Sequence, residues 1–129
     1  MELIESSDGI SVFCGSRIGY HKSYFEAGRQ LGKSLGVAGI KIIYGGGSQG
    51  IMGALADAAL EAGGEVVGVI PRFMVDREWA HPRISKLHIV DSLHQRKEIM
   101  LHASQYIVAL PGGFGTLEEL TEVISWAQL

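Results

Sequence analysis

The residues best suited to chemistry lie in a glycine-rich turn near the end of the chain. Pro111-Gly-Gly-Phe-Gly-Thr116 follows an apolar run, and Glu119 comes three residues after Thr116. Glycine lets a ligand approach backbone amides closely, and amides at the start of a helix favour an anion, phosphate above all. We expect an anion-binding turn here, with Glu119 as the candidate acid–base group. The alternative is that Thr116-Leu-Glu-Glu119 is only a T-x-x-E capping box.

Two earlier turns have a similar composition. Gly15-Ser16-Arg17 and Gly45-Gly-Gly-Ser-Gln-Gly50 each follow an apolar run. The second is not a Walker A loop, because no Gly-Lys-Ser/Thr follows it, and Asp57 comes too early to bind a ribose at an offset of about 20 residues. It indicates either a phosphate-binding turn or tight packing of a helix on a sheet.

Arg96 and Lys97 are the candidate cations. They follow Ser92-Leu-His-Gln95, an S-x-x-Q capping box that predicts a helix start. Cations this close to a helix N-terminus oppose the helix dipole, at a cost of roughly a few tenths of a kcal/mol. This mildly unfavourable placement favours a functional role. The alternative is a solvated basic pair.

Other chemistries find little support. His94 and His102 have no acidic partner motif, so no metal site is expected, and no G-x-S-x-G or Cys–His pattern indicates a nucleophile. Cys14 is the only cysteine and lies in an apolar run, which predicts a reduced, buried thiol. We expect no cofactor.

Short apolar runs alternate with helical stripes along the chain. The first helix has its apolar stripe at Tyr20, Tyr24, Ala27, Leu31 and Leu35, with Gly36 and Gly39 ending it, and Gly63-Gly64 ends the second. The segment 71–86 has no clear period and is long for a connection, which is typical of a lid or an interface. Strands are predicted at 10–14, 40–44, 65–70, 87–90 and 106–110, and helices after about 20, 51, 92 and 117.

This order predicts an α/β protein. Continuously apolar strands are typical of a parallel sheet covered on both faces, and right-handed crossovers then give a Rossmann-like, doubly wound, three-layer α/β/α domain. Residues 1–129 are expected to form one nucleotide-binding domain that is short at its C-terminus, because the last apolar helical pattern stops at Leu129 without a cap. Ligands of such sheets bind beyond the carboxyl ends of the strands.

Charge and hydropathy exclude some partners. The net charge is −3 and the pI is about 5.9, so long-range attraction to nucleic acid or acidic membranes is not expected. No apolar stretch approaches the roughly 20 residues that span a bilayer, and the N-terminus lacks the basic region of a secretory signal. The cytoplasm is the predicted compartment.

Three motifs together resemble the LONELY GUY (LOG) family: Gly45-Gly-Gly-Ser-Gln-Gly-Ile-Met-Gly53, Leu93-His-Gln-Arg-Lys97 with Met100, and Pro111 to Glu119. The resemblance runs from about Ile10 to Leu129. It implies a cytokinin riboside 5′-monophosphate phosphoribohydrolase, a class often mislabelled lysine decarboxylase. Such an enzyme hydrolyses the N-glycosidic bond of a nucleoside 5′-monophosphate to free base and ribose 5-phosphate. The family resemblance also implies a homodimer or larger assembly with the site near the subunit interface.

The resemblance also implies roles for individual residues. Arg96 and Glu119 match the catalytic pair, and Leu93 and Gln95 replace a usual methionine and a frequent glutamate, which bears on base preference. Cleavage passes through an oxocarbenium-like sugar, so Glu119 would stabilise that charge or orient water, and Arg96 would hold the base or the sugar. The residues matching substrate or phosphate contacts are Ser16, Glu78, Lys97, Gly113, Phe114, Gly115, Thr116 and Ser125, the last standing for a usual threonine.

Two rival functions share parts of this pattern. A non-catalytic nucleotide or molybdenum-cofactor carrier would have a similar fold and similar glycine turns, but the pairing of Arg96 with Glu119 favours the enzyme. A lysine decarboxylase is disfavoured, because no lysine lies in a recognisable pyridoxal phosphate context and the chain is very short for that chemistry.

Overall fold

The computed structural model describes residues 9–15, 22–78, 80–110, 121 and 124–125, apart from the side chains of Asp76 and Glu78. Within these residues, strands and helices alternate as predicted. The elements are β1 (Ile10–Phe13), α1 (Lys22–Val37), β2 (Ile42–Tyr44), α2 (Gly50–Glu61), β3 (Val66–Pro71), η1 (Arg72–Met74), α3 (Val75–Glu78), β4 (Lys86–Val90), α4 (Leu93–His102) and β5 (Tyr106–Ala109).

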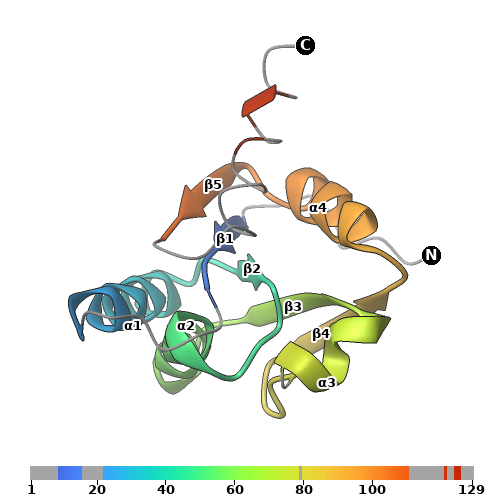
Figure 1. The fold of residues 1–129 in the computed structure, drawn as a ribbon. Helices are drawn as coiled ribbons and strands as arrows, with labels where there is room; N and C mark the ends of the chain where they lie inside the picture. The colour runs from blue at the N-terminus through green and yellow to red at the C-terminus, as the bar shows by residue number, and fades with distance from the viewer. Residues whose placement is uncertain (1–8, 16–21, 79, 111–120, 122–123, 126–129) are drawn as a thin grey trace.

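The five strands form one parallel sheet in the order β4-β3-β2-β1-β5. The chain moves outward from β1 to β4, and α4 then returns it across the sheet to pair β5 with β1 (Figure 1). The strand order therefore reverses between β1 and β5, which is where ligands bind in open α/β sheets. The predicted doubly wound parallel sheet is confirmed.

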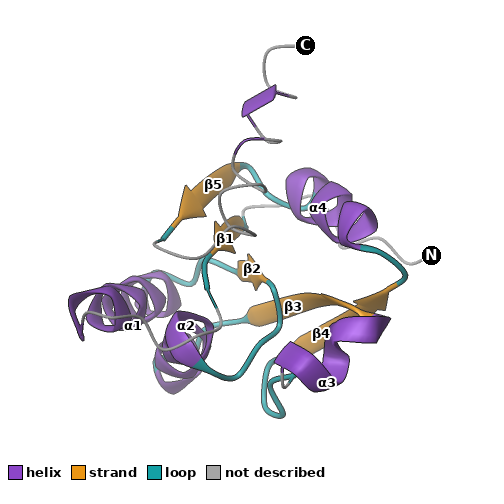
Figure 2. Cartoon of the chain, in the orientation of Figure 1, coloured by secondary structure: helices purple, strands orange, loops and turns teal. Residues whose placement is uncertain are grey.

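Helices cover both faces of the sheet (Figure 2). Successive residues of a strand point to opposite faces, so each strand supplies two separate hydrophobic clusters. Val12, Ile42 and Val66 contribute to the cluster beneath α1 and α2, which also contains Leu35 and Leu55. Their neighbours in sequence, Phe13, Ile43 and Val67, contribute to the cluster beneath α4. That cluster also contains Val69, Val90, Ile99, Met100 and Ala103. The three layers are thus encoded by continuously apolar strands.

A row of glycines brings α1 and α2 into close contact. Gly28, Gly32 and Gly36 lie four residues apart and are all buried. A Cβ added at Gly28 would meet the side chain of Ile51 at 2.7 Å, and one at Gly32 would meet the backbone of Leu55. Small residues at this spacing form a flat strip on one side of a helix, which lets two backbones approach closely.

The predicted apolar stripe of α1 is only half right. Leu31 and Leu35 face the core, but Tyr24 is 39% exposed and Ala27 is exposed. The physical reason is that the glycine row, rather than the large side chains, sets which side of α1 faces α2.

Glycines end α1 and α2 in the same way. Gly39 has φ of +72° and Gly63 has φ of +81°, a conformation that favours glycine. After each, the next residue donates its N–H back across the last turn: Ile40 to Leu35, and Gly64 to Ala59. This is the Schellman pattern. Gly36 does not end α1, which continues to Val37, because Gly36 serves the contact with α2 instead.

The segment 71–86 is more ordered than its sequence indicates. It contains the short helices η1 and α3, whereas residues 81–85 form no helix or strand, so the prediction of an irregular connection is correct only for its second part. Each helix is too short to display a periodic apolar stripe. The segment then returns to the sheet, where the N–H of Ser85 donates to Val66 O at 2.9 Å and the Ser85 hydroxyl accepts from Val66 N at 3.0 Å.

Candidate functional site

The carboxyl ends of the strands meet at one rim of the sheet. The backbone N–H of Leu110 donates to Phe13 O at 2.8 Å, so β1 and β5 end level with each other. The N–H of Met52 donates to Gly15 O at 3.2 Å, which brings the start of α2 to the same rim. The described parts of the predicted glycine turns, at Gly15 and at 45–50, therefore lie where parallel sheets bind ligands.

Arg96 reaches this rim from the opposite face of the sheet. Its side chain is buried, with the residue 4% exposed. Its Nε donates to Val69 O at 2.8 Å and its Nη2 donates to Gly45 O at 2.6 Å. Burying a cation is costly unless its N–H groups find acceptors, and two main-chain carbonyls meet part of that need. The guanidinium is thus fixed beside the glycine turn.

Gly45 is required by this arrangement. A Cβ at position 45 would collide with Nη2 of Arg96 and would meet Cε of Met52 at 2.7 Å. The absence of a side chain at the start of the turn therefore makes room for the guanidinium. The glycine turn serves the placement of Arg96 as well as the packing of α2.

The start of α4 sets which side chains face the sheet. Ser92 is the N-cap, and its hydroxyl accepts from Gln95 N at 3.1 Å, as the capping box predicts. The Gln95 side chain accepts from Asp91 N at 2.8 Å instead of from Ser92. With the helix start fixed there, Arg96 and Lys97 are both buried, the latter 6% exposed. The alternative of a solvated basic pair was therefore wrong.

The glycine turn is also held from the side of residues 80–83. Gly46, at φ of +85°, accepts a hydrogen bond from His81 N at 2.8 Å, and Gly47 forms an antiparallel bridge with Ala80. The Tyr44 hydroxyl donates to Gly47 O at 2.7 Å. The turn is thus held from two sides, by the hydrogen bond from Arg96 of α4 and by the contacts of Ala80 and His81.

His81 anchors that segment to α2. Its Nε2 lies 2.7 Å from Asp57 Oδ1, and Arg83 Nη2 lies 3.1 Å from the same oxygen. The backbone N–H of Arg83 donates to His81 Nδ1 at 3.0 Å. No sequence motif indicated a role for His81. The only hint was Asp57, a charge within the apolar run 51–60, which calls for a partner.

Several predicted site residues lie outside the described residues. Glu78 ends α3, three residues before His81, but its side chain is not described. Ser125 is described and exposed. The structure thus brings Arg96 to the rim and buries Lys97 beside it on α4, and it leaves the relation of the remaining residues to the rim a prediction. Those outside the described residues are Ser16, Gly113, Phe114, Gly115, Thr116 and Glu119.

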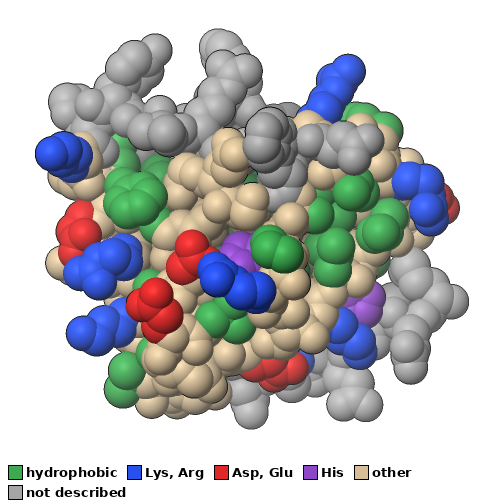
Figure 3. Space-filling view, turned by 90° about the horizontal axis from the view of Figure 1, so that it is seen from below, with side chains coloured by type: hydrophobic (Ala, Val, Ile, Leu, Met, Phe, Trp, Pro, Cys, Tyr) green, Lys and Arg blue, Asp and Glu red, His purple; other side chains and the backbone are tan. Residues whose placement is uncertain are grey.

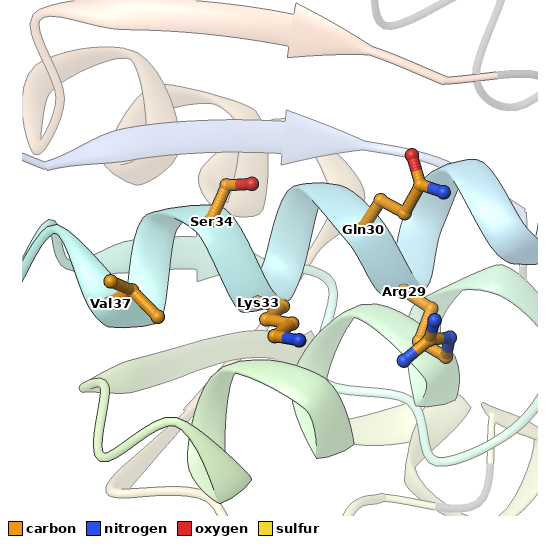
Figure 4. Close-up of a pocket in the computed structure, with 5 residues that line it drawn as sticks. All are labelled: Arg29, Gln30, Lys33, Ser34 and Val37. Atoms are coloured by element: carbon orange, nitrogen blue, oxygen red, sulfur yellow. The ribbon is translucent and has the colours of Figure 1, made fainter.

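A shallow cavity of about 580 Å³ lies elsewhere, along the outer side of α1. Its labelled side chains all come from this one helix, with Gln30 and Ser34 pointing to one side and Arg29 to the other (Figure 4). Arg29 pairs with Glu26 at 2.6 Å, and this hydrogen bond lowers the pKa of the Glu26 carboxyl. No predicted site residue lines this cavity, and an exposed surface on one helix is a poor match for a substrate site.

The charged side chains on the face of the molecule in Figure 3 form no patch of a single sign. On the face in Figure 3, basic and acidic side chains are interspersed among the described residues. No helix in the described part of the chain is long and apolar enough to span a membrane. Nor do the described residues hold a cluster of three histidine, cysteine or acidic side chains that could bind a metal ion.

With a doubly wound sheet and a buried arginine at its ligand-binding rim, the chain is a Rossmann-like α/β protein. The family model described as "possible lysine decarboxylase" matches residues 52–129. The chain belongs to this family, and its LOG resemblance is confirmed by the names of its curated relatives.

Two such relatives illustrate the likeness. A probable cytokinin riboside 5′-monophosphate phosphoribohydrolase of Oryza sativa subsp. japonica is 47% identical over 120 residues, 93% of this chain and 53% of the relative. A cytokinin riboside 5′-monophosphate phosphoribohydrolase of Arabidopsis thaliana is 45% identical over 129 residues, 100% of this chain and 61% of the relative. The chain therefore spans about half the length of the curated relatives it matches.

Solved structures support the fold. The Moco carrier protein from Chlamydomonas reinhardtii has a TM-score of 0.77 at 24% identity, covering 92% of this chain and 70% of that one. The molybdenum cofactor binding protein from Rippkaea orientalis has a TM-score of 0.74 at 19% identity, covering 91% and 71%. At these identities the likeness concerns the fold alone.

Proposed function

We propose that the protein hydrolyses the N-glycosidic bond of a nucleoside 5′-monophosphate, a cytokinin riboside monophosphate or AMP, releasing the base and ribose 5-phosphate. The observation that carries the proposal is the buried guanidinium of Arg96, fixed at the ligand-binding rim by Val69 O and Gly45 O. The names of the curated relatives, at 44–49% identity, support the same reaction.

The chemistry of the step requires a cation and a carboxylate at different points. Water oxygen forms a bond to C1′ while the C1′–N bond breaks; the bonding pair leaves with the base, the attacking water loses one proton, and the base gains one, so no net proton is consumed. Positive charge develops on the sugar in between. Glu119 stabilises that charge or orients the water, and Arg96 holds the departing base or the sugar. Because Arg96 is already fixed before substrate arrives, little reorganisation is needed during the reaction.

The phosphate provides binding energy away from the reacting bond. We propose that backbone amides of the turn 113–116 bind it, so that C1′ is placed between Arg96 and Glu119. Lys97 adds a positive charge near the same rim. Further substrate contacts in this proposal are Ser16, Glu78, Gly113, Phe114, Gly115, Thr116 and Ser125.

The alternative is a carrier of a nucleotide or molybdenum cofactor. The carrier proteins among the structural neighbours share the fold, but their identity to this chain is 24% or less in the two cases above. A carrier would bind the ligand and return it unchanged, so a product assay separates the two functions.

The test is release of free base from AMP and from a cytokinin riboside 5′-monophosphate, followed by chromatography. We expect release by the wild type and loss of it in Glu119→Gln and Arg96→Ala. Arg29→Ala, which removes an exposed arginine of α1, is the matched control and should keep wild-type turnover. Absence of base release by the folded wild type, or normal turnover in Glu119→Gln, would overturn the proposal.

Arg96→Ala needs a companion variant. Removing the side chain leaves Val69 O and Gly45 O without their donor, at a cost of about 1–3 kcal/mol, so inactivity could reflect unfolding. Arg96→Lys keeps the charge but loses the forked geometry that reaches both carbonyls. Circular dichroism must show both variants folded, and turnover should fall in both.

Location and assembly are part of the same proposal. We place the protein in the cytoplasm, with residues 1–129 as one nucleotide-binding domain in a homodimer or larger homo-oligomer. Light scattering on the purified protein tests the assembly, and a monomeric mass at micromolar concentration would contradict it.

A further inference from the structure

A buried histidine outside the predicted site connects three segments: the glycine turn, residues 80–83 and helix α2. The His81 side chain is 1% exposed, while the Asp57 side chain on α2 is 42% exposed and that of Arg83 is 71% exposed. His81 therefore lies beneath a surface ion pair. Its backbone N–H meanwhile donates to Gly46 O in the glycine turn.

The hydrogen bonds define the form of the imidazole ring. Because the backbone N–H of Arg83 donates to Nδ1, that nitrogen accepts and carries no proton. Nε2 must then carry the proton and donate it to Asp57 Oδ1 at 2.7 Å. Both ring nitrogens are thus committed, one within its own loop and one to α2.

These contacts form a short path to Arg96. The backbone N–H of His81 donates to Gly46 O, and Ala80 forms an antiparallel β-bridge with Gly47. Gly45, the next residue in the turn, accepts from Arg96 Nη2 at 2.6 Å. A shift of the segment 80–83 relative to α2 would move Gly46 and, with it, the carbonyl that fixes the guanidinium.

We propose that His81 is a positioning residue: its link to Asp57 holds residues 80–83 and the glycine turn in register, and so fixes Arg96 for catalysis. This inference rests on the function proposed above.

Two substitutions separate the two ring contacts. In His81→Asn, Oδ1 occupies the place of Nδ1 and still accepts from Arg83 N, as in an Asx-turn, but the side chain no longer reaches Asp57. In His81→Gln, the amide nitrogen occupies the place of Nε2 and still donates to Asp57. If the link to α2 is what matters, the Gln variant is rescued and the Asn variant is impaired.

Steady-state kinetics with AMP gives the first readout. We expect kcat of His81→Asn to fall about tenfold, because small displacements of catalytic groups are costly, while KM stays within about twofold since the phosphate turn is a separate segment. His81→Gln should keep most of the wild-type kcat. Equal kcat in the two variants, whether both normal or both reduced, would overturn the proposal.

A double-mutant cycle tests whether the effect passes through Arg96. In an Arg96→Lys background, the guanidinium that donates to both Gly45 O and Val69 O is already lost. Adding His81→Asn should therefore change kcat little. A purely structural role would reduce the folded fraction in both backgrounds alike. Additive losses of kcat per folded molecule would therefore refute the route through Arg96.

Nuclear magnetic resonance of the Arg96 Nε–Hε group gives a readout that needs no activity. This proton is buried and donates to Val69 O, so it should exchange slowly with solvent in the wild type and in His81→Gln. Exchange should be several-fold faster in His81→Asn. If exchange of the Arg96 Nε–Hε proton is unchanged in His81→Asn, the positioning role of His81 is refuted even in an active enzyme. If the wild type releases no base but exchange responds as expected, the proposed reaction fails and the positioning of Arg96 by His81 stands.

Discussion

Replacing Gly45 by alanine tests the close fit between the glycine turn and Arg96. Gly45 is not among the glycines with positive φ, so alanine adds no backbone strain at this position. The added methyl group would overlap Nη2 of Arg96 and approach Cε of Met52 at 2.7 Å. The Met52 side chain can rotate away. The guanidinium cannot move without stretching its bonds to Gly45 O and Val69 O.

The expected loss follows from those contacts. A hydrogen bond to a charged group contributes about 1.5–3 kcal/mol, and Gly45→Ala should reduce the free energy of unfolding by about that amount. A displacement of roughly 1 Å in a catalytic group costs about 100-fold in rate, so kcat for base release from AMP should fall by roughly two orders of magnitude. Urea denaturation and steady-state kinetics measure the two quantities.

Gly63→Ala is the matched control. Gly63 has φ of +81°, and a Cβ there meets no atom within 4 Å. Alanine in this left-handed conformation costs about 1–2 kcal/mol, a similar loss of stability at the far end of α2. Its kcat should equal the wild-type value. If Gly45→Ala keeps normal kcat and stability, or if Gly63→Ala loses as much kcat, the steric reasoning about Arg96 is wrong.

Three further substitutions test the elements that support the rim. Gly32→Ala places a methyl group against the backbone of Leu55 and should reduce stability by about 1–3 kcal/mol in urea denaturation; a neutral result would contradict the close α1–α2 contact. Ser92→Ala removes the N-cap of α4 and should cost about 1 kcal/mol, seen as a lower Tm, whereas Ser92→Asp should restore it. Ser11→Ala removes one of two hydroxyls that donate to Met100 O, and the Ser104 hydroxyl remains. The free energy of unfolding should therefore fall by an amount at the low end of about 0.5–1.5 kcal/mol, and a larger fall would show that Ser104 does not compensate.

Much of the fold follows from local patterns. Continuous apolar runs predicted all five parallel strands to within a few residues. The reason is clearest for β1, β2 and β3, which are almost entirely buried on both faces. Ser92 predicted the start of α4, and Gly39 and Gly63 ended their helices, because each satisfies backbone groups within its own turn. Such features depend on neighbouring residues and can be recognised without knowing the fold.

Contacts between distant segments were not predictable in the same way. The glycine row of α1 has meaning only against α2, and large apolar side chains such as Tyr24 suggested the wrong face. His81 and Asp57 are 24 residues apart, and nothing in their local sequence pairs them. Spacing alone left open whether Arg96 was a solvated cation. Its burial depends on Val69 and Gly45, which only the folded sheet brings within reach.

Two of the groups that hold Arg96 are the peptide carbonyl oxygens of Val69 and Gly45, and this has a consequence for how the site tolerates change. A carboxylate partner would release the arginine on protonation, but a carbonyl oxygen has no proton to gain across the pH range in which the protein is folded. The acceptor at position 69 would also persist if valine were exchanged for isoleucine, because every amino acid presents the same oxygen. These two contacts are thereby insensitive to acidity and to much sequence drift. Position 45 is different, since only the residue without a side chain leaves room there.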